Sequence, residues 1–208
     1  MISSKISKVV IKRLPKYLRV LEGFLIREIE RVSSKELAIK LGSTASQVRQ
    51  DFNCFGDFGQ HGYGYKVKEL YLKIKEILGL NKKYSCIVVG AGNIGQAIMN
   101  YSKFFTMGFN IEAIFDINPK IIGLSFREVE VLDVELLIDY VKNNKIDLAI
   151  LCIPELQVES IYTILKDRVT GIWNFATVDL LSTEKTFVEN VNLNDSLFTL
   201  TYFINNGV

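Results

Sequence analysis

The sequence predicts an α/β fold in two parts, a small basic helical module followed by a mostly parallel, doubly wound sheet. From residue 84 onward, apolar runs of strand length alternate with helical patterns, which is typical of a parallel sheet. Directly after the first of these runs, residues 90–95 read GAGNIG, a G-x-G-x-x-G turn. Residues 1–83 hold 17 Lys and Arg against 8 Asp and Glu, whereas residues 84–208 hold 8 against 15. Unless this asymmetry is chance surface composition, it indicates a module for a polyanion joined to an acidic module.

Composition excludes several other classes of protein. The chain has 208 residues, 49% of them apolar, which allows one large domain or two small ones. Its apolar runs stay short of the ~18 residues that a membrane span needs, and its N-terminus lacks the apolar core of a signal peptide. Its 3 cysteines form no C-x-x-C motif, so neither a metal site nor a disulfide framework is expected. We therefore expect a cytoplasmic protein with no membrane partner and no metal.

Three helices are expected before residue 54. The first has Pro15 in its first turn and then repeats apolar residues at helical spacing, namely Tyr17, Leu18, Leu21, Phe24, Leu25 and Ile29. The second starts at Ser33 in an S-x-x-E capping box and stops at Gly42. The third is capped by Thr44 and turns Val48 and Phe52 inward.

The second and third helices, joined by a tight glycine turn, have the pattern of a helix-turn-helix. The third helix leaves outward the polar side chains that can reach base edges in a major groove: Ser46, Gln47, Arg49, Gln50 and Asn53. The alternative is an ordinary solvated helix face in a small bundle. The basic charge of the module favours double-stranded DNA as the partner.

Residues 56–66 alternate glycine with aromatic residues and leave no room for a helix. We expect a short hairpin there, the wing of a winged helix-turn-helix, with its tip near His61 either touching DNA or simply exposed. A fourth helix is expected over residues 67–78, and the polar stretch 79–83 closes a DNA-binding domain of residues 1–83. The further DNA-binding candidates in this domain are Arg13, Tyr17, Phe55, Gly56, His61, Tyr63 and Lys66.

The stretch from residue 84 to 116 has the parts of a dinucleotide site. Gly90 permits the tight turn, Gly92 lets a pyrophosphate approach the backbone, and Gly95 lets the next helix lie against the strand. The free N–H groups of that helix attract an anion. The apolar run 111–115 ends in Asp116, whose carboxylate suits two ribose hydroxyls and repels a 2′-phosphate, which favours NAD over NADP. The alternative is a glycine turn that binds nothing.

Strand and helix patterns continue through a Rossmann-like domain of residues 84–192. A single helix after the glycine turn carries Ile98, Tyr101, Phe104 and Phe105 on one side, and further helices are expected at 134–141 and 158–165. Strands are expected at 147–153, at 171–175 and at 187–191. The ligand crevice should lie at the carboxyl ends of the strands. Its NAD(H)-binding candidates are Gly90, Ala91, Gly92, Asn93, Ile94, Gly95, Asp116, Ile117, Cys152, Ile153 and Pro154.

The last helix, expected over residues 195–204, is apolar on more than one side. Its apolar residues are Leu193, Leu197, Phe198, Leu200, Tyr202, Phe203 and Ile204. A helix of this kind must be buried on most faces, and a small domain can hardly bury it alone. A partner subunit is the first interpretation, and packing inside its own chain is the alternative.

An NAD-linked oxidoreductase with a helical N-terminal appendage is the competing function. Tyr162 and Lys166 have the Y-x-x-x-K spacing of short-chain dehydrogenases, but so do Tyr71 and Lys75 outside the sheet domain. The domain has no histidine, and hydride transfer to a carbonyl needs a placed acid or base. We therefore expect no catalytic residue and no enzyme activity. A third hypothesis is a different effector of the CoA type on the same fold.

With these residues assembled, the chain resembles the family of redox-sensing transcriptional repressors called Rex in bacteria. The segments that carry the resemblance are RLPKYLRVL (13–21), RVSSKELAIKLG (31–42), QVRQDFNCFGDFGQHGYGY (47–65), VVGAGNIGQAI (88–98), FDINPKIIG (115–123) and LTYF (200–203). The resemblance implies a homodimer whose C-terminal helices, residues 193–208, are exchanged between subunits. It also implies operator binding when NAD⁺ dominates and release when NADH rises, with Tyr101 near the cofactor and the dimer interface.

A few positions depart from the pattern usual in that family. Gln50 stands where Lys or Arg is usual, Cys54 replaces a Tyr, and Asn192 replaces an Asp. Ser196 and Phe198 replace the Glu and Gln of an E-L-Q segment. The sequence therefore leaves open the operator, the genes controlled and the relative affinities for NADH and NAD⁺.

Overall fold

The computed structural model describes residues 6–56 and 63–207, and it divides the chain into two compact units, Met1–Lys82 and Lys83–Val208. The predicted tip of the wing, including His61, lies outside the described residues. Among the helices of the described ranges, none is long and apolar enough to cross a membrane.

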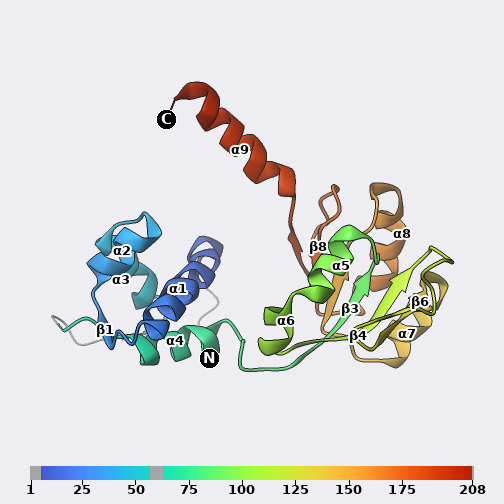
Figure 1. Cartoon of the computed structure of the whole chain (residues 1–208), viewed down its shortest axis with the longest axis horizontal. Coiled ribbons are helices and arrows are strands. Elements are labelled where there is room, and N and C mark those ends of the chain that lie inside the picture. The colour runs from blue at the N-terminus through green and yellow to red at the C-terminus, as the bar shows by residue number, and fades with distance from the viewer. Residues whose placement is uncertain (1–5, 57–62, 208) are drawn as a thin grey trace. The chain divides into compact units, whose positions relative to one another are not determined.

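Unit 1 is a helical module closed by a small ribbon (Figure 1). Its helices are α1 (Lys8–Ile26), α2 (Ser34–Leu41), α3 (Ala45–Asn53) and α4 (Val67–Ile77). Strand β1 (Arg31–Val32) pairs antiparallel with β2 (Tyr65–Lys66), a pairing that the sequence did not predict. Its core is built from the inward faces of all four helices, with Leu14, Leu37, Phe52 and Ile74 almost fully buried.

The first helix begins earlier than predicted. Ser7 caps it by accepting a hydrogen bond from the N–H of Val9, so the helix runs from Lys8 and Pro15 lies in its interior rather than its first turn. A proline there removes one backbone hydrogen bond. The carbonyl that loses its donor is that of Ile11, and Ile11 is 44% exposed, so water can reach it.

The helix-turn-helix forms as predicted. Ser33 and Glu36 make both hydrogen bonds of the capping box on α2, and Gly42 ends that helix in the left-handed conformation at φ 61°. Thr44 caps α3 through the N–H of Gln47 at 3.1 Å. Val48 and Phe52 are buried, which turns the polar side of α3 outward.

Unit 2 is built on one seven-stranded sheet with the order β5-β6-β4-β3-β7-β8-β9. All neighbouring strands run parallel except β5 and β6. The strands are β3 (Tyr84–Val89), β4 (Phe109–Asp116), β5 (Ser125–Phe126), β6 (Val129–Asp133), β7 (Leu148–Leu151), β8 (Gly171–Asn174) and β9 (Phe187–Asn190). The chain builds outward from β3 in one direction and from β7 in the other, so a topological switch point lies between these two strands.

Helices cover both faces of the sheet (Figure 1). On one face, α5 (Asn93–Asn100) and α6 (Ser102–Thr106) pack Met99 and Phe104 on the strands. On the other, the 3-10 turn η1 (Val134–Leu136), α7 (Leu137–Asn143) and α8 (Glu155–Leu165) close a larger core. This arrangement confirms the predicted α/β, Rossmann-like, mostly parallel architecture.

Two features of unit 2 differ from the sequence prediction. The hairpin of β5 and β6 was not predicted, and it turns through Arg127 and Glu128, both at positive φ. The helix predicted to carry Ile98 through Phe105 on one side is broken at Tyr101, whose ψ of 100° is extended. As a result, Tyr101 is 56% exposed instead of facing inward.

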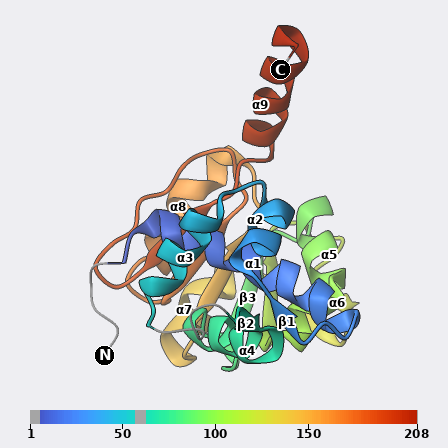
Figure 2. The same ribbon diagram turned by 90° about the vertical axis from the view of Figure 1, so that its left-hand side faces the viewer.

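Helix α9 (Leu193–Asn206) ends the described chain, and every residue from Leu193 to Gly207 is exposed. The views of Figures 1 and 2 both show α9 without another element of its own unit alongside it. Its apolar side chains stay uncovered in a single chain: Leu197 is 53% exposed, Phe198 64% and Ile204 69%. Helix α9 therefore does not pack inside its own unit.

Candidate functional site

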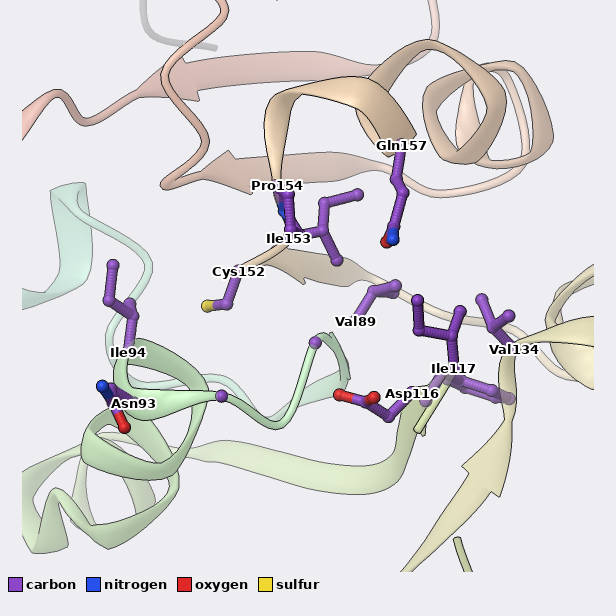
Figure 3. Close-up of a pocket in the computed structure, with 13 residues that line it drawn as sticks. Val89, Asn93, Ile94, Asp116, Ile117, Val134, Cys152, Ile153, Pro154 and Gln157 are labelled. Atoms are coloured by element: carbon purple, nitrogen blue, oxygen red, sulfur yellow. The ribbon is translucent and has the colours of Figure 1, made fainter. Parts of the chain in front are cut away.

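A crevice of about 470 Å³ opens at the carboxyl ends of the central strands of unit 2. Strand β3 leads into it with Val89 and Gly90, β4 with Asp116 and Ile117, and β7 with the turn Cys152–Pro154 (Figure 3). This position is the topological switch point, where parallel α/β sheets bind ligands. The volume falls in the range of small-molecule sites.

The three glycines of the turn have three different surroundings. Gly90 has φ +96°, and a Cβ there would meet the carbonyl oxygen of Cys152 at 2.4 Å. A Cβ on Gly95 would meet the carbonyl oxygen of Gly90 at 2.1 Å, so this glycine allows helix α5 to lie against the turn. A Cβ on Gly92 would meet nothing within 4 Å. The open side of Gly92 therefore faces free space, and Gly92 lines the crevice.

The N-terminus of α5 points its backbone N–H groups into this space. Gly92 is the N-cap residue, and no side chain caps the helix. The first N–H groups of a helix have no partner within the helix, and together with the helix dipole they attract an anion. Gln96 stabilises the glycine turn, because its side-chain amide donates a hydrogen bond of 2.8 Å to the carbonyl of Ala91.

Asp116 is the single carboxylate among the described residues that line the crevice. One of its oxygens accepts the N–H of Ala91 at 2.7 Å, and the other accepts the N–H of Asn118 at 2.8 Å. These bonds fix the carboxylate beside the glycine turn, and each oxygen keeps further acceptor capacity for a hydroxyl. Neither Lys nor Arg occurs in the described lining, so nothing there would neutralise a 2′-phosphate beside Asp116.

The walls of the crevice are apolar, formed by Ile94, Ile117, Val134 and Ile153 with Val89, Phe115 and Pro154 (Figure 3). Cys152 also lines it, and burial raises the pKa of this thiol to about 12. The thiol therefore stays protonated at neutral pH, so the crevice offers a ligand an apolar surface rather than a reactive thiolate.

Most of the predicted cofactor residues meet at this crevice. Gly90, Gly92, Asn93, Ile94, Asp116, Ile117, Cys152, Ile153 and Pro154 all line it. Ala91 is buried behind the turn, and Gly95 supports it. Tyr101 is not brought to the crevice of its own chain. Sequence reasoning missed Gln157, whose signal was a polar residue in the first helical turn after the strand-ending Pro154.

In unit 1, the exposed face of α3 carries Ser46, Arg49, Gln50 and Asn53. Three of these, Ser46, Gln50 and Asn53, follow at i, i+4 and i+7 and so form one stripe. Arg49 donates to the hydroxyl of Ser34 at 3.0 Å, which links α3 to the start of α2. An exposed polar stripe on the second helix of a helix-turn-helix is what contact with base edges would require.

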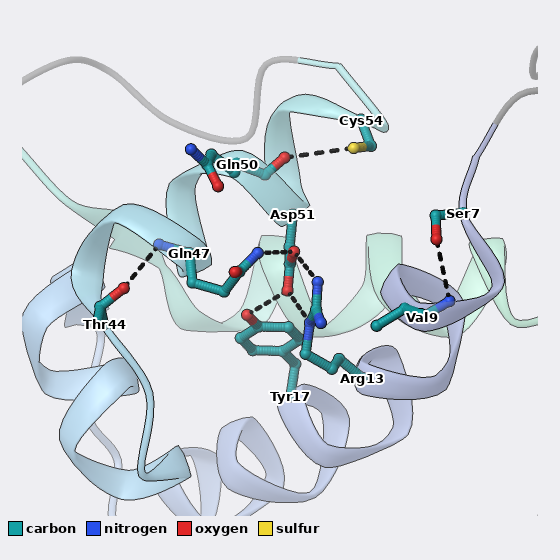
Figure 4. Close-up of polar contacts among 9 residues, drawn as sticks. All are labelled: Ser7, Val9, Arg13, Tyr17, Thr44, Gln47, Gln50, Asp51 and Cys54. Carbon is teal, nitrogen blue, oxygen red and sulfur yellow. Dashed lines mark hydrogen bonds and ion pairs between the residues drawn. The ribbon is translucent and has the colours of Figure 1, made fainter.

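Three other DNA-binding candidates instead meet at Asp51, on the inward side of α3. Arg13 donates two hydrogen bonds of 2.6 Å to its carboxylate, Tyr17 one of 2.8 Å and Gln47 one of 2.8 Å (Figure 4). Burial alone would raise the pKa of Asp51, but these hydrogen bonds outweigh burial and hold the pKa below its ordinary value. These three side chains are therefore engaged within the unit.

The remaining candidates lie on either side of residues 57–62, where the tip of the wing was predicted. Tyr63 is 72% exposed, and its carbonyl accepts a hydrogen bond from Arg31 at 2.9 Å. Lys66 is exposed and pairs with Glu69 at 2.6 Å. Gly56 has φ +105°, and Phe55 packs partly buried against the core of the unit.

The residues with dehydrogenase-like spacing take no part in the crevice. Tyr162 donates its hydroxyl to the carbonyl of Leu181 at 2.6 Å, and the ammonium of Lys166 lies over its ring at 5.8 Å. Neither residue lines the crevice among the described residues.

The chain is similar to proteins of known family over nearly its whole length. Residues 5–53 match the family model “Putative DNA-binding protein N-terminus”, and residues 81–178 match the model “CoA binding domain”. The redox-sensing transcriptional repressor Rex of Clostridium tetani is 58% identical, over 96% of this chain and 95% of that protein.

Two solved structures of RSP, a Rex-family repressor, are also similar. RSP in complex with β-NAD⁺ and operator DNA matches with a TM-score of 0.92 at 50% identity, over 99% of this chain and 95% of that chain. RSP in complex with β-NADH matches with a TM-score of 0.90 at 48% identity, over 99% and 97% of the two chains. These relatives are repressors, which confirms the prediction of a DNA-binding regulator over an enzyme. The chain belongs to the Rex family of redox-sensing transcriptional repressors.

Proposed function

We propose that this protein represses transcription by binding operator DNA through unit 1 when NADH is low, and that it releases the DNA when NADH occupies unit 2. The observation that carries the proposal is the uncapped N-terminus of α5, which faces a crevice whose single described carboxylate is Asp116. A nicotinamide dinucleotide presents, on one ligand, a pyrophosphate for such a helix N-terminus and a ribose diol for such a carboxylate.

The cofactor would bind with its pyrophosphate at the first turn of α5 and with ribose hydroxyls on Asp116. Gly92 leaves room for the pyrophosphate, and Asp116 is held in place by the N–H groups of Ala91 and Asn118. The apolar walls disfavour the cationic nicotinamide of NAD⁺ relative to the neutral ring of NADH, because burying an unpaired charge is costly. This difference would allow the ligand to shift an equilibrium between two states of the protein.

The DNA would be read by the exposed stripe of α3 lying in a major groove. Ser46, Arg49, Gln50 and Asn53 are exposed and carry the donors and acceptors that base edges require. The wing, with Tyr63 and Lys66, would contact the adjacent backbone. Like the clostridial repressor that it resembles, the protein would work where the DNA is, in the cytoplasm.

A homodimer completes the proposal. Helix α9 exposes Leu197, Phe198, Leu200 and Ile204 in a single chain, and apolar surface of this extent is typical of an interface. A second copy of the chain, offering its own α9, would bury it. Two recognition helices would then lie about one DNA turn apart, roughly 34 Å, on a palindromic operator.

The test is a binding titration with a labelled palindromic duplex selected by the protein from a random-sequence pool. Fluorescence anisotropy would follow the duplex while NADH, NAD⁺ or CoA is added. We expect NADH to weaken binding at least about tenfold and NAD⁺ to have little effect. Equal effects of NADH and NAD⁺ would overturn the sensing proposal, and an effect of CoA alone would replace the dinucleotide by a CoA-type effector.

Two variants separate the activities of the units. Asp116→Ala should remove the NADH effect and leave DNA affinity unchanged, while Asp139→Ala, an exposed acid on α7, serves as the matched control. Arg49→Ala should weaken DNA binding while NADH binding persists. Loss of both activities in each variant would mean that the substitutions act on folding and would contradict these assignments.

A further inference from the structure

Asp51 is the one fully buried acid among the described residues of unit 1, and it lies on the recognition helix itself. Its side chain is 1% exposed. Gln47 donates to it from one turn earlier on α3, whereas Arg13 and Tyr17 donate from α1 (Figure 4). The four hydrogen bonds therefore join two helices through one carboxylate.

These four hydrogen bonds saturate the carboxylate. One oxygen accepts from the Nε of Arg13 and the hydroxyl of Tyr17, and the other accepts from the Nη2 of Arg13 and the amide of Gln47. A carboxylate has about four acceptor positions, so none is left for water or for DNA. The two bonds from Arg13 form the bidentate fork, the most directional of the charge-assisted hydrogen bonds.

The directional hydrogen bonds to Asp51 fix the rotation of α3 about its axis, which the apolar core of this unit cannot do alone. Val48 and Phe52 hold α3 by burial, which is a non-directional force. Successive residues of a helix are about 100° apart around its axis, so a small rotation of α3 would replace one exposed stripe by another. The fork from Arg13 resists that rotation because it fixes Asp51 relative to α1.

The cluster also determines what Gln47 can offer. A carboxylate only accepts hydrogen bonds, so the amide nitrogen of Gln47 must face Asp51 and its oxygen must face away. A free glutamine reads adenine by donating and accepting at once. With one of its two amide hydrogens engaged by Asp51, Gln47 cannot turn its amide over, so the direction in which its oxygen accepts is fixed. Gln50, on the same helix, points away from the cluster (Figure 4). Its side-chain amide has no hydrogen-bond partner among the residues that the structure describes.

We propose that Asp51 is a positioning residue for operator recognition: its carboxylate fixes the rotation of α3 on α1 and the orientation of the Gln47 amide. The proposal rests on operator binding by unit 1, as proposed above. Asp51 itself touches no DNA, because all its acceptor positions are filled from inside the unit.

The decisive experiment compares two affinities for each variant of the full chain, at a temperature well below its melting temperature. One duplex is the palindrome selected by the wild type, and the other is a scrambled duplex of the same composition and length. Asp51→Asn turns two acceptor positions into donors that face the donors of Arg13 or Gln47. Arg13→Lys keeps the positive charge and removes the fork. Glu76→Gln, in an exposed pair with Lys73 on α4, is the matched control.

We expect Asp51→Asn and Arg13→Lys each to weaken binding to the selected duplex about tenfold or more, and binding to the scrambled duplex less than about threefold. Glu76→Gln should change neither affinity. A lower melting temperature with an unchanged ratio of the two affinities would mean that Asp51 only stabilises the unit, and would overturn the proposal. If Asp51→Asn does not fold, Tyr17→Phe and Arg13→Lys carry the test, and an unchanged ratio in both overturns it.

Operator binding itself and the role of Asp51 are refuted by different outcomes. A wild-type protein that selects no duplex from the pool would refute operator binding itself. A wild-type protein that selects one, with variants that discriminate equally well, would refute only the role of Asp51.

Discussion

Two glycines of the turn have different roles: Gly95 allows the fold to pack, and Gly92 leaves space for a ligand. Gly95 lies where a Cβ would be 2.1 Å from the carbonyl oxygen of Gly90, so its lack of a side chain serves packing. Gly92 has nothing within 4 Å of a Cβ position and an extended backbone at φ −71°, so any residue can stand there as far as the fold is concerned. Its lack of a side chain matters only if a ligand approaches.

Two alanine variants test this division. Gly95→Ala should lower the stability of unit 2 by about 1–3 kcal/mol, because the backbone must shift to avoid the clash. Gly92→Ala should cost less than about 1 kcal/mol, the difference between alanine and glycine at an N-cap, and still weaken NADH binding at least about tenfold. Thermal unfolding and NADH fluorescence titration measure the two effects. If Gly92→Ala binds NADH normally, the pyrophosphate does not lie at this turn.

Asp51 makes unit 1 sensitive to acid. Its pKa is lowered in the folded protein, since the hydrogen bonds outweigh burial, so the stabilisation is complete above the pKa of the unfolded chain. We expect the free energy of unfolding of the wild type to exceed that of Asp51→Asn by about 3 kcal/mol at neutral pH. This difference should shrink as the pH falls below about 4 and through the lowered pKa of the folded state. Hydrogen exchange of the amides of α1 and α3 reports it locally, and a difference that is constant with pH would contradict the assignment.

Among the described helices of unit 2, α9 is the one that its own unit leaves uncovered. Leu193, Leu197, Leu200 and Ile204 recur at the spacing of one helical stripe, and all are more than half exposed. Their burial against a second copy is the simplest way to remove this apolar surface from water. Asn192 fixes the start of the helix by capping it through the N–H of Asn194.

Replacing the central pair of that stripe tests the dimer. Leu197→Asp with Leu200→Asp should convert the protein to a monomer, since burying two unpaired charges costs several kcal/mol. Sedimentation equilibrium measures the mass of the species in solution. Thr199→Glu, on the polar side of α9, is the control and should leave the dimer intact. A double variant that stays dimeric would place the interface elsewhere.

Some starts and ends of the helices and strands could be predicted from the sequence, and others could not. The capping box at Ser33, the cap at Thr44 and the strand leading into Gly90 were predictable because each depends on residues close together in sequence. The start of α1 was missed because Pro15 suggested a first turn, while the cap at Ser7 lay further back. The break at Tyr101 and the hairpin through Arg127 belong together, since Arg127 donates to the carbonyl of Asn100 and lies over the ring of Phe105. Such long-range contacts leave no local pattern.

The site shows the same limit. Gly90, Gly92 and Asp116 follow from a motif with fixed spacing, so the sequence was enough to find them. Gln157 enters the crevice because α8 begins at once after the turn Cys152–Pro154 that follows β7, which spacing alone does not reveal. The engagement of Arg13 with Asp51 joins residues 38 positions apart, and no pattern in the sequence separates an arginine that faces DNA from one that faces a buried acid.

For the whole molecule, the proposal links two binding events on separate units, and thermodynamics requires the link to be reciprocal. If saturating NADH raises the dissociation constant for the operator by a given factor, saturating operator must raise the dissociation constant for NADH by the same factor. We expect this factor to be at least about tenfold, equivalent to ~1.4 kcal/mol of coupling. Titrating NADH against free protein and against the protein–duplex complex measures the factor for NADH, and titrating the duplex with and without NADH measures the factor for the operator.

The L197D/L200D monomer should lose the coupling while each unit still binds its own ligand weakly, because the two recognition helices are no longer held by one dimer. Unequal factors would mean that a further process, such as aggregation, accompanies one of the titrations. Coupling that survives in the monomer would place the switch inside one chain.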